Sequence, residues 1–219
     1  MFSPELWRAV FEHHRARVPA LVDFVLNPAH GALPSRVARA LRVSAEPVRA
    51  TLPYDARPWS RCLLLGYAEL EAASPELNCD MDMIWFASQG AAQQMRVATH
   101  LGALQLALPL RRRVSRALLA PFVERDMLDA VRFAQRQPAA DDAFLLEEAH
   151  AWSSEQLAQA MAPLGLACLH RAQAMVPARL AWRWQLRRPT ASIRTDMEPA
   201  LAWRMSLDVA RQLEPVWFS

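Results

Sequence analysis

Residues 101–137 constrain the fold of this chain more than any other stretch, because they combine two amphipathic patterns with the densest cluster of charge. Val114, Leu118 and Leu119 are spaced so that they can share one face of a helix. The charge cluster consists of Arg111, Arg112, Arg113 and Arg116. A second apolar stripe with roughly helical spacing follows it: Phe122, Met127, Leu128, Val131 and Phe133. The stretch therefore predicts a helix pair that buries one face in a core and shows a basic face to water or to a partner.

Composition extends this prediction to the whole chain. The 219 residues are 53% hydrophobic and 21% charged, which is typical of a folded globular protein and not of a disordered one. Glycine is scarce, with five residues, and strong β-formers rarely cluster. We therefore expect a mostly all-α fold, built as a single compact helical domain.

Prolines divide the N-terminal part of the chain. Pro47, Pro53 and Pro58 make residues 44–57 the most loop-like stretch, and we interpret it as a linker. It would join an N-terminal helical part, residues 1–44, to a main helical body, residues 58–219, within one structural domain overall. Just before it, residues 35–43 predict a short helix, on which three arginines recur at a spacing of three: Arg36, Arg39 and Arg42.

Helix starts are also visible in the C-terminal half. Ser153 followed by Gln156 is a capping-box pattern, and Thr195 followed by Glu198 is a second one. Both predict a helix immediately downstream.

Residues 179–188 show a different pattern, because their apolar side chains alternate. Leu180, Trp182, Trp184 and Leu186 lie on one side at period two, which favours a short extended, hairpin-like segment. A helix opened by Pro177 is the alternative.

The same segment interleaves aromatic and basic residues. Tryptophan and arginine are enriched at interface hot spots, so Trp182, Trp184 and Arg187 join the central arginines as candidate partner-binding residues. An alternative interpretation is a helical nucleic-acid-binding or regulatory protein that uses its arginine clusters and stacks bases on the tryptophans. The formal net charge of +3 is too small to imply nucleic acid by itself.

Motifs for chemistry are missing from the sequence. There is no HExxH, GxSxG, Walker A or GxGxxG pattern, and Cys62, Cys79 and Cys168 show no paired ligand spacing. We expect no enzyme, no metal, no cofactor and no small-molecule substrate. A run of about 18 apolar residues, which a membrane span requires, is also absent, as is a secretory signal.

Several short motifs together resemble the SctK family, the YscK/PscK-type accessory proteins of type III secretion systems. The central one is Leu101-Gly102 followed by Leu108-Pro109-Leu110-Arg111-Arg112 and Val114. Others are Leu26-Asn27-Pro28, Gly165-Leu166-Ala167 and the stretch from Ala181 to Leu186. The tail contributes Leu207, Val209, Gln212, Leu213 and Pro215.

The resemblance implies a non-enzymatic adaptor of the injectisome sorting platform, acting in virulence-associated protein transport. Its expected partners are an SctD-like inner-membrane ring protein, through its cytoplasmic domain, and an SctQ-like pod protein. Its expected place is the cytoplasm of a Gram-negative bacterium, at the cytoplasmic face of the inner membrane. Recognition of partners, and not chemistry, would then be its mechanism.

Overall fold

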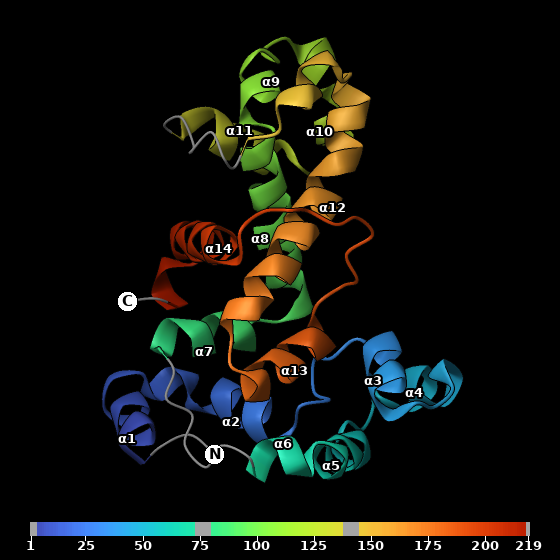
Figure 1. The fold of residues 1–219 in the computed structure, drawn as a ribbon, viewed down its shortest axis with the longest axis vertical. Helices are drawn as coiled ribbons and strands as arrows, with labels where there is room; N and C mark the ends of the chain where they lie inside the picture. The colour runs from blue at the N-terminus through green and yellow to red at the C-terminus, as the bar shows by residue number, and fades with distance from the viewer. Residues whose placement is uncertain (1–3, 73–79, 138–144, 218–219) are drawn as a thin grey trace. The chain divides into compact units, whose positions relative to one another are not determined.

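The computed structural model describes residues 4–72, 80–137 and 145–217, and helices dominate all three ranges (Figure 1). No strand occurs within them, so the predicted all-α fold is confirmed. The chain forms two compact units, each of which makes most of its contacts internally. Unit 1 comprises residues 1–91 and 176–189, and unit 2 comprises residues 92–175 and 190–219. The expected boundary near residues 44–58 therefore lies inside unit 1.

Unit 1 is built from short helices, most of which have a proline at or beside their first residue. Proline suits the first turn of a helix because its fixed φ is already helical and its missing N–H would have no partner there. The helices are α1 (Pro4–His13), α2 (Val18–Leu26), α3 (Pro34–Leu41), α4 (Ala45–Thr51), α5 (Arg57–Gly66), α6 (Ala68–Ala72), α7 (Met81–Ser88) and α13 (Ala178–Arg187), with a 3-10 turn, η1 (Arg15–Arg17), between the first two.

The prediction that residues 44–57 form a loop-like linker is wrong. Helix α4 occupies its middle, Pro47 lies in the first turn of that helix, and Pro58 lies in the first turn of α5. Val48 and Leu52 are buried, so the stretch contributes to the core of unit 1.

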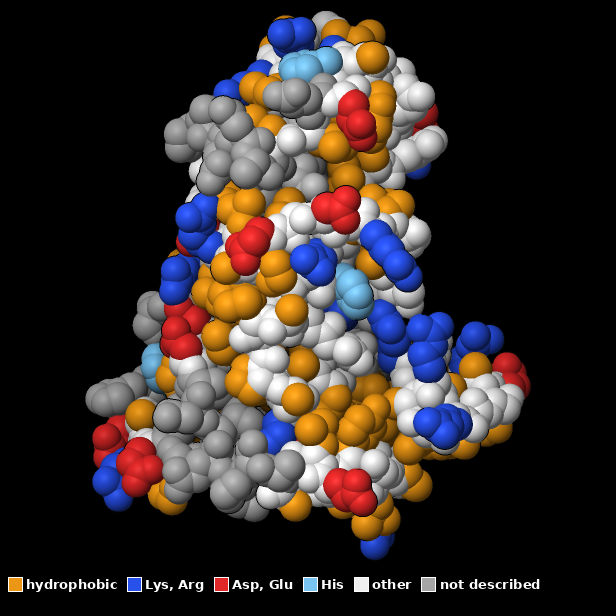
Figure 2. Space-filling model, in the orientation of Figure 1, with side chains coloured by type: hydrophobic (Ala, Val, Ile, Leu, Met, Phe, Trp, Pro, Cys, Tyr) orange, Lys and Arg blue, Asp and Glu red, His pale blue; other side chains and the backbone are white. Residues whose placement is uncertain are grey.

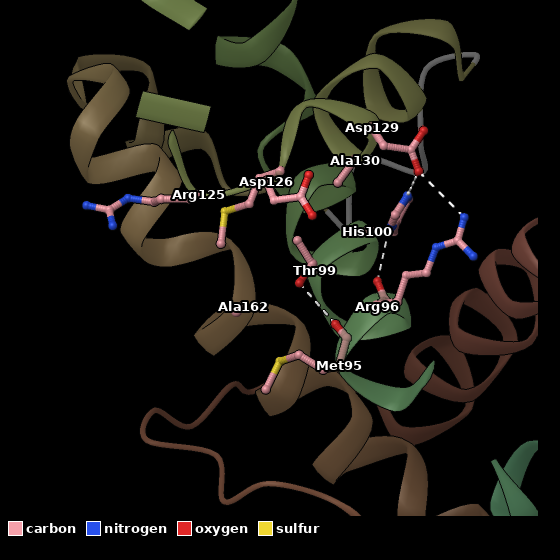
Figure 3. Close-up of a pocket in the computed structure, with 10 residues that line it drawn as sticks. Met95, Arg96, Thr99, His100, Arg125, Asp126, Asp129, Ala130 and Ala162 are labelled. Atoms are coloured by element: carbon pink, nitrogen blue, oxygen red, sulfur yellow. Dashed lines mark hydrogen bonds and ion pairs between the residues drawn. The ribbon is translucent and has the colours of Figure 1, made fainter. Parts of the chain in front are cut away.

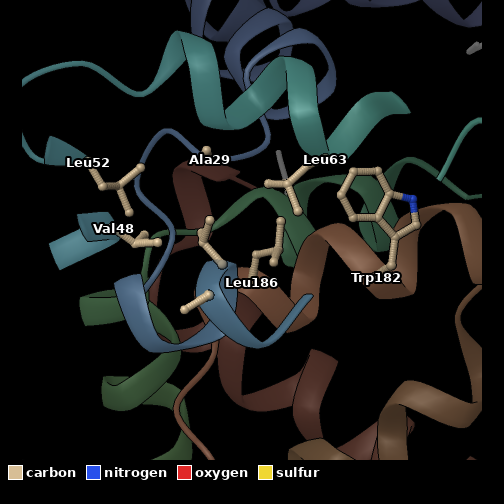
Figure 4. Packing of buried hydrophobic residues seen from close by; sticks show 8 residues of the cluster. Ala29, Val48, Leu52, Leu63, Trp182 and Leu186 are labelled. Atoms are coloured by element: carbon tan, nitrogen blue, oxygen red, sulfur yellow. The ribbon is translucent and has the colours of Figure 1, made fainter. Parts of the chain in front are cut away.

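Helix α13 lies at the centre of unit 1 and corrects the prediction of an extended segment near residues 179–188. It packs against α3, α6 and α7. Trp182 and Leu186 from α13 join a buried apolar cluster with residues of the N-terminal helices (Figure 4). The backbone N–H of Leu33 donates to the Leu186 carbonyl at 2.8 Å, which joins the start of α3 to the end of α13.

Unit 2 contains the longer helices. They are α8 (Ala91–Gln105), α9 (Ala107–Arg111), α10 (Arg116–Glu124), α11 (Leu128–Arg136), α12 (Ser154–Ala172) and α14 (Pro199–Leu213), with the 3-10 turns η3 (Glu147–Ala151), η4 (Gln173–Met175) and η5 (Pro215–Trp217). The capping box of Ser153 and Gln156 starts α12 as predicted. The second predicted box is wrong. Glu198 itself caps α14 by accepting from the Leu201 N–H, while the Thr195 hydroxyl accepts from Met197.

Two glycines set the approach of α8 and α12, which run side by side in Figure 1. A Cβ at Gly102 would fall on the backbone of Met161, and a Cβ at Gly165 would fall on the backbone of Ala98. The helices therefore touch backbone to backbone, which only glycine permits. Helix α14 packs on α12, and α9, α10 and α11 complete the unit. Within the described ranges, no helix is both long and apolar enough to cross a membrane.

Candidate interaction surface

The four central arginines lie where α9 passes into α10. Helix α9 ends at Arg111, and the Arg113 N–H returns to the Leu110 carbonyl at 3.0 Å. Ser115 then caps α10 by accepting from the Leu118 N–H at 3.4 Å. The chain therefore leaves the helix for four residues, 112–115, and this break decides where the arginines point.

Two of the four arginines face inward. Arg111 Nη2 donates to the Gln137 carbonyl at 2.7 Å, and Arg113 Nη2 donates to the Trp152 carbonyl at 2.8 Å. Both side chains are half-buried. Gln135 adds hydrogen bonds to the carbonyls of Leu110 and Arg113, at 2.9 and 3.3 Å. Arg111 and Arg113 are therefore positioned to hold the α9–α10 connection in place and not to meet a partner.

Arg112 and Arg116 are exposed, and exposed aliphatic side chains lie beside them in the chain. Val114 is 77% exposed, Val123 is 57% exposed and Leu118 is 40% exposed. We call Arg112, Val114, Arg116, Leu118 and Val123 the α9–α10 surface. Of these, Arg116 and Val123 are seven residues apart and share one outward face of α10.

The aliphatic part of this surface was missed by the sequence interpretation. Val114, Leu118 and Leu119 were expected to share one buried helical face. Val114 precedes α10 and is exposed, because helical spacing does not carry across the break between Arg111 and Arg116. Within α10 only Phe122 is fully buried. The second predicted stripe is correct at Phe122, Val131 and Phe133, which are all buried.

The remaining candidate residues lie in unit 1, and they are buried. Trp184 is completely buried and meets Phe86 edge to face, with ring centroids 5.2 Å apart. Arg187 lies over the ring of Phe24 and donates to the carbonyls of Ser88 and His30, at 2.6 and 3.0 Å. Trp182 is buried as well. A stacking platform for nucleic-acid bases requires exposed rings, so Trp182 and Trp184 cannot provide one while α13 is folded in place.

A carboxylate explains how α13 keeps its arginines inside. Glu71 on α6 accepts from Arg183 at 2.6 Å, from Arg179 at 2.9 Å and from the Trp182 indole at 3.1 Å. Burial raises the pKa of Glu71, but hydrogen bonds and charge from Arg183, with hydrogen bonds from Arg179 and Trp182, outweigh it and lower the pKa to about 2. Sequence gave no sign of this pairing, because Glu71 lies more than a hundred positions from its partners.

A second set of titratable groups lines a cavity of about 480 Å³ in unit 2 (Figure 3). His100 Nδ1 lies 2.8 Å from the Arg96 carbonyl, and Nε2 lies 3.3 Å from an Asp129 carboxylate oxygen. Arg96 also pairs with Asp129 and with Glu214, at 3.7 and 3.1 Å. Burial lowers the pKa of His100, although Asp129 and the carbonyl partly offset it.

This histidine is held by its Nδ1 atom, whereas Nε2 can donate to Asp129 only when the ring is doubly protonated. A carbonyl oxygen only accepts, so Nδ1 carries a proton and donates to Arg96. Among the described residues that line the cavity, Thr99 has a hydroxyl group, which could in principle act as a nucleophile. This hydroxyl donates to the Met95 carbonyl of its own helix at 3.0 Å. The cluster links α8 to α11 and α14, and its geometry offers no activated nucleophile.

The two described cysteines differ in exposure. Burial raises the pKa of Cys168 to about 12, and Cys62 is exposed on α5. Cys79 lies outside the described residues. Among those described, no group of three or more His, Cys, Asp and Glu side chains is placed to hold a metal ion.

Comparison with protein-family models, with curated proteins and with solved structures found no match.

Proposed function

We propose that this chain is a non-enzymatic adaptor of a type III secretion sorting platform. It would link the cytoplasmic domain of an SctD-like inner-membrane ring protein to an SctQ-like pod protein. The family and its partners come from the sequence resemblance, which centres on Leu108-Pro109-Leu110-Arg111-Arg112. The α9–α10 surface is the part of the molecule that supports a role in docking.

The observation that carries the proposal is the mixed character of this surface. Arginine and aliphatic side chains are exposed together on one short segment, at Arg112, Val114, Arg116, Leu118 and Val123. Arginine is enriched at protein interfaces, and aliphatic groups there gain free energy when a partner removes them from water. An arginine that only contacts water would not require exposed aliphatic side chains beside it.

The anchoring beneath the surface supports the same role. Arg111 and Arg113 are fixed to backbone carbonyls of distant residues, Gln137 and Trp152. A partner that docks on Arg112 and Arg116 would therefore meet a connection that is already ordered. Preorganisation reduces the entropy lost on binding and so favours affinity.

Co-expression with the SctQ-like and SctD-like proteins of the same genome tests the proposal. We expect a stable complex with at least one of them at about 0.3 M salt, where exposed charge pairs are strongly screened. Arg112→Glu with Arg116→Glu should weaken that complex at least tenfold while helicity stays unchanged. If neither protein binds and the purified chain retains RNA or DNA, the adaptor proposal fails.

A matched variant separates docking from net charge. Arg132→Glu with Arg136→Glu changes the charge by the same amount on the exposed side of α11, also in unit 2. This control should leave partner affinity within about twofold, since surface charges outside an interface contribute little. Equal losses in the two variants would show that only overall charge matters.

A further inference from the structure

The arginines on α3 and at its C-terminal cap form a basic stripe that the proposed adaptor role does not use. Arg36 and Arg39 are three residues apart on α3, so they are neighbours on the helix surface, and Arg42 is the residue that caps the end of this helix with a left-handed backbone (φ 56°). Arg39 and Arg42 are exposed and Arg36 is half-buried. Figure 2 shows basic side chains gathered over the region where Figure 1 places α3 and α4.

The stripe borders a pocket of about 290 Å³ in unit 1. Its polar lining comes from the three arginines and Gln185, and its aromatic wall from Tyr67 and Trp182. The two rings are stacked, with centroids 4.5 Å apart and planes within 2° of parallel. The described lining residues include no acidic side chain.

Arg36 is fixed at this pocket by neutral groups. Its Nε donates to the Arg188 carbonyl at 2.9 Å, and its Nη2 donates to the Pro189 carbonyl at 3.0 Å. Carbonyl oxygens satisfy hydrogen bonds but do not cancel the charge, and neither bond uses Nη1. Burial, and then the nearby charge of Arg39, lower the pKa of Arg36, which indicates that positive charge here is crowded and partly desolvated.

The carboxylate closest to this wall is already occupied. Glu71 accepts from the Trp182 indole, but it is shared with Arg179 and Arg183. Arg39 and Arg42 form no ion pair with any residue that the structure describes. Arg49, on the adjacent helix α4, differs from them because it pairs with Glu46 at 3.6 Å.

We propose that this pocket binds the phosphate group of a small soluble ligand. Three guanidinium groups around a small concave space suit a compact anion of charge near −2 better than a single carboxylate. Guanidinium also matches phosphate oxygens through paired, charge-assisted hydrogen bonds. The half-buried Tyr67 ring, backed by the buried Trp182, offers an apolar contact to the rest of a phosphorylated molecule.

Calorimetric titration with inorganic phosphate and pyrophosphate tests the site directly, with sodium chloride at matched ionic strength as the reference. We expect saturable binding of both anions, tighter for pyrophosphate because it carries more charge. The same anions should raise the thermal midpoint of unfolding above that in chloride. Arg39→Gln with Arg42→Gln should weaken binding at least tenfold, while Arg36 is left intact because it holds the end of α13.

Arg49→Gln is the matched control, since it removes a positive charge from the neighbouring helix but not from the pocket lining. It should bind pyrophosphate within about twofold of the unmodified chain. Circular dichroism on each variant would show that the helices persist.

Two kinds of result would overturn the proposal. One is an equal response to phosphate and to chloride, or equal binding by the Arg39/Arg42 variant and the unmodified chain. The other is binding to phosphoinositide-containing vesicles without any response to soluble phosphate or pyrophosphate, which would assign the stripe to a membrane surface. Tighter binding of a nucleoside monophosphate than of phosphate would support the site and show that the pocket also contacts the rest of the ligand.

Discussion

The two arginine-rich segments of this chain look alike in sequence and have opposite environments. Helix α13 carries Arg179, Arg183 and Arg187, all buried, whereas the α9–α10 connection exposes Arg112 and Arg116. The difference lies in the acceptors available to each segment. Glu71 pairs with Arg179 and Arg183, and backbone carbonyls accept from Arg183 and Arg187, so each of these buried side chains has an acceptor inside unit 1. Density of arginine therefore does not by itself identify a binding surface.

The comparison predicts that removing the acceptor damages the buried segment most. Glu71→Ala should lower the free energy of unfolding by about 3–5 kcal/mol, because it leaves two buried guanidinium groups without their counter-charge. Chemical denaturation followed by circular dichroism measures this loss. Glu69→Ala, an exposed acid on the same helix, is the control and should stay within about 0.5 kcal/mol of the unmodified chain. A loss below about 1 kcal/mol for Glu71→Ala would mean that water replaces the carboxylate at little cost.

Lowering the pH should weaken the same interaction, because it protonates the Glu71 carboxylate. The pKa of Glu71 is about 2 in the folded chain and lies near 4.3 in an unfolded one, so the folded state favours the ionised form. The resulting stabilisation is present above about pH 4.3 and is lost as the pH falls toward 2. Unfolding measured across this range should show a fall in stability that Glu71→Gln lacks. Parallel pH profiles for the two proteins would contradict the assignment.

Within the central segment, the inward and outward arginines should differ in a smaller but measurable way. Arg111→Ala and Arg113→Ala each remove a hydrogen bond from a cationic donor to a half-buried carbonyl. We expect each to lower the free energy of unfolding by about 1–3 kcal/mol. Thermal unfolding of the two single variants measures this effect. Values indistinguishable from those of Arg112→Ala would show that the inward contacts do not stabilise unit 2.

Sequence predicted the helical class well and the role of α13 poorly, for a reason visible in its residues. The strand interpretation counted the apolar positions Leu180, Trp182, Trp184 and Leu186, which alternate. Burial of the arginines at spacing four, Arg179, Arg183 and Arg187, supplies the helical period that this pattern hid. A buried charge is rare unless it is paired, and its partner Glu71 is too distant in sequence to be found from one chain.

Prolines misled the prediction in a different way. Pro47 and Pro58 predict a linker from sequence alone, but each lies in the first turn of a helix, where proline is favoured. At the candidate surface, the two exposed arginines were identified and the aliphatic residues were not. The helix is interrupted between Arg111 and Arg116, so residues on the two sides of the interruption do not keep helical spacing. Spacing in the sequence alone does not reveal such an interruption.

The smallest expected effect on stability belongs to the exposed pair, and it separates structure from function most cleanly. Arg112→Ala and Arg116→Ala should each leave the free energy of unfolding within about 0.5 kcal/mol, because both side chains are in water. If the α9–α10 surface docks a partner, the same substitutions should still weaken the complex, since their contacts form only there. A loss of binding that tracks a loss of stability would instead place Arg112 and Arg116 with Arg111 and Arg113, as residues that hold the connection together.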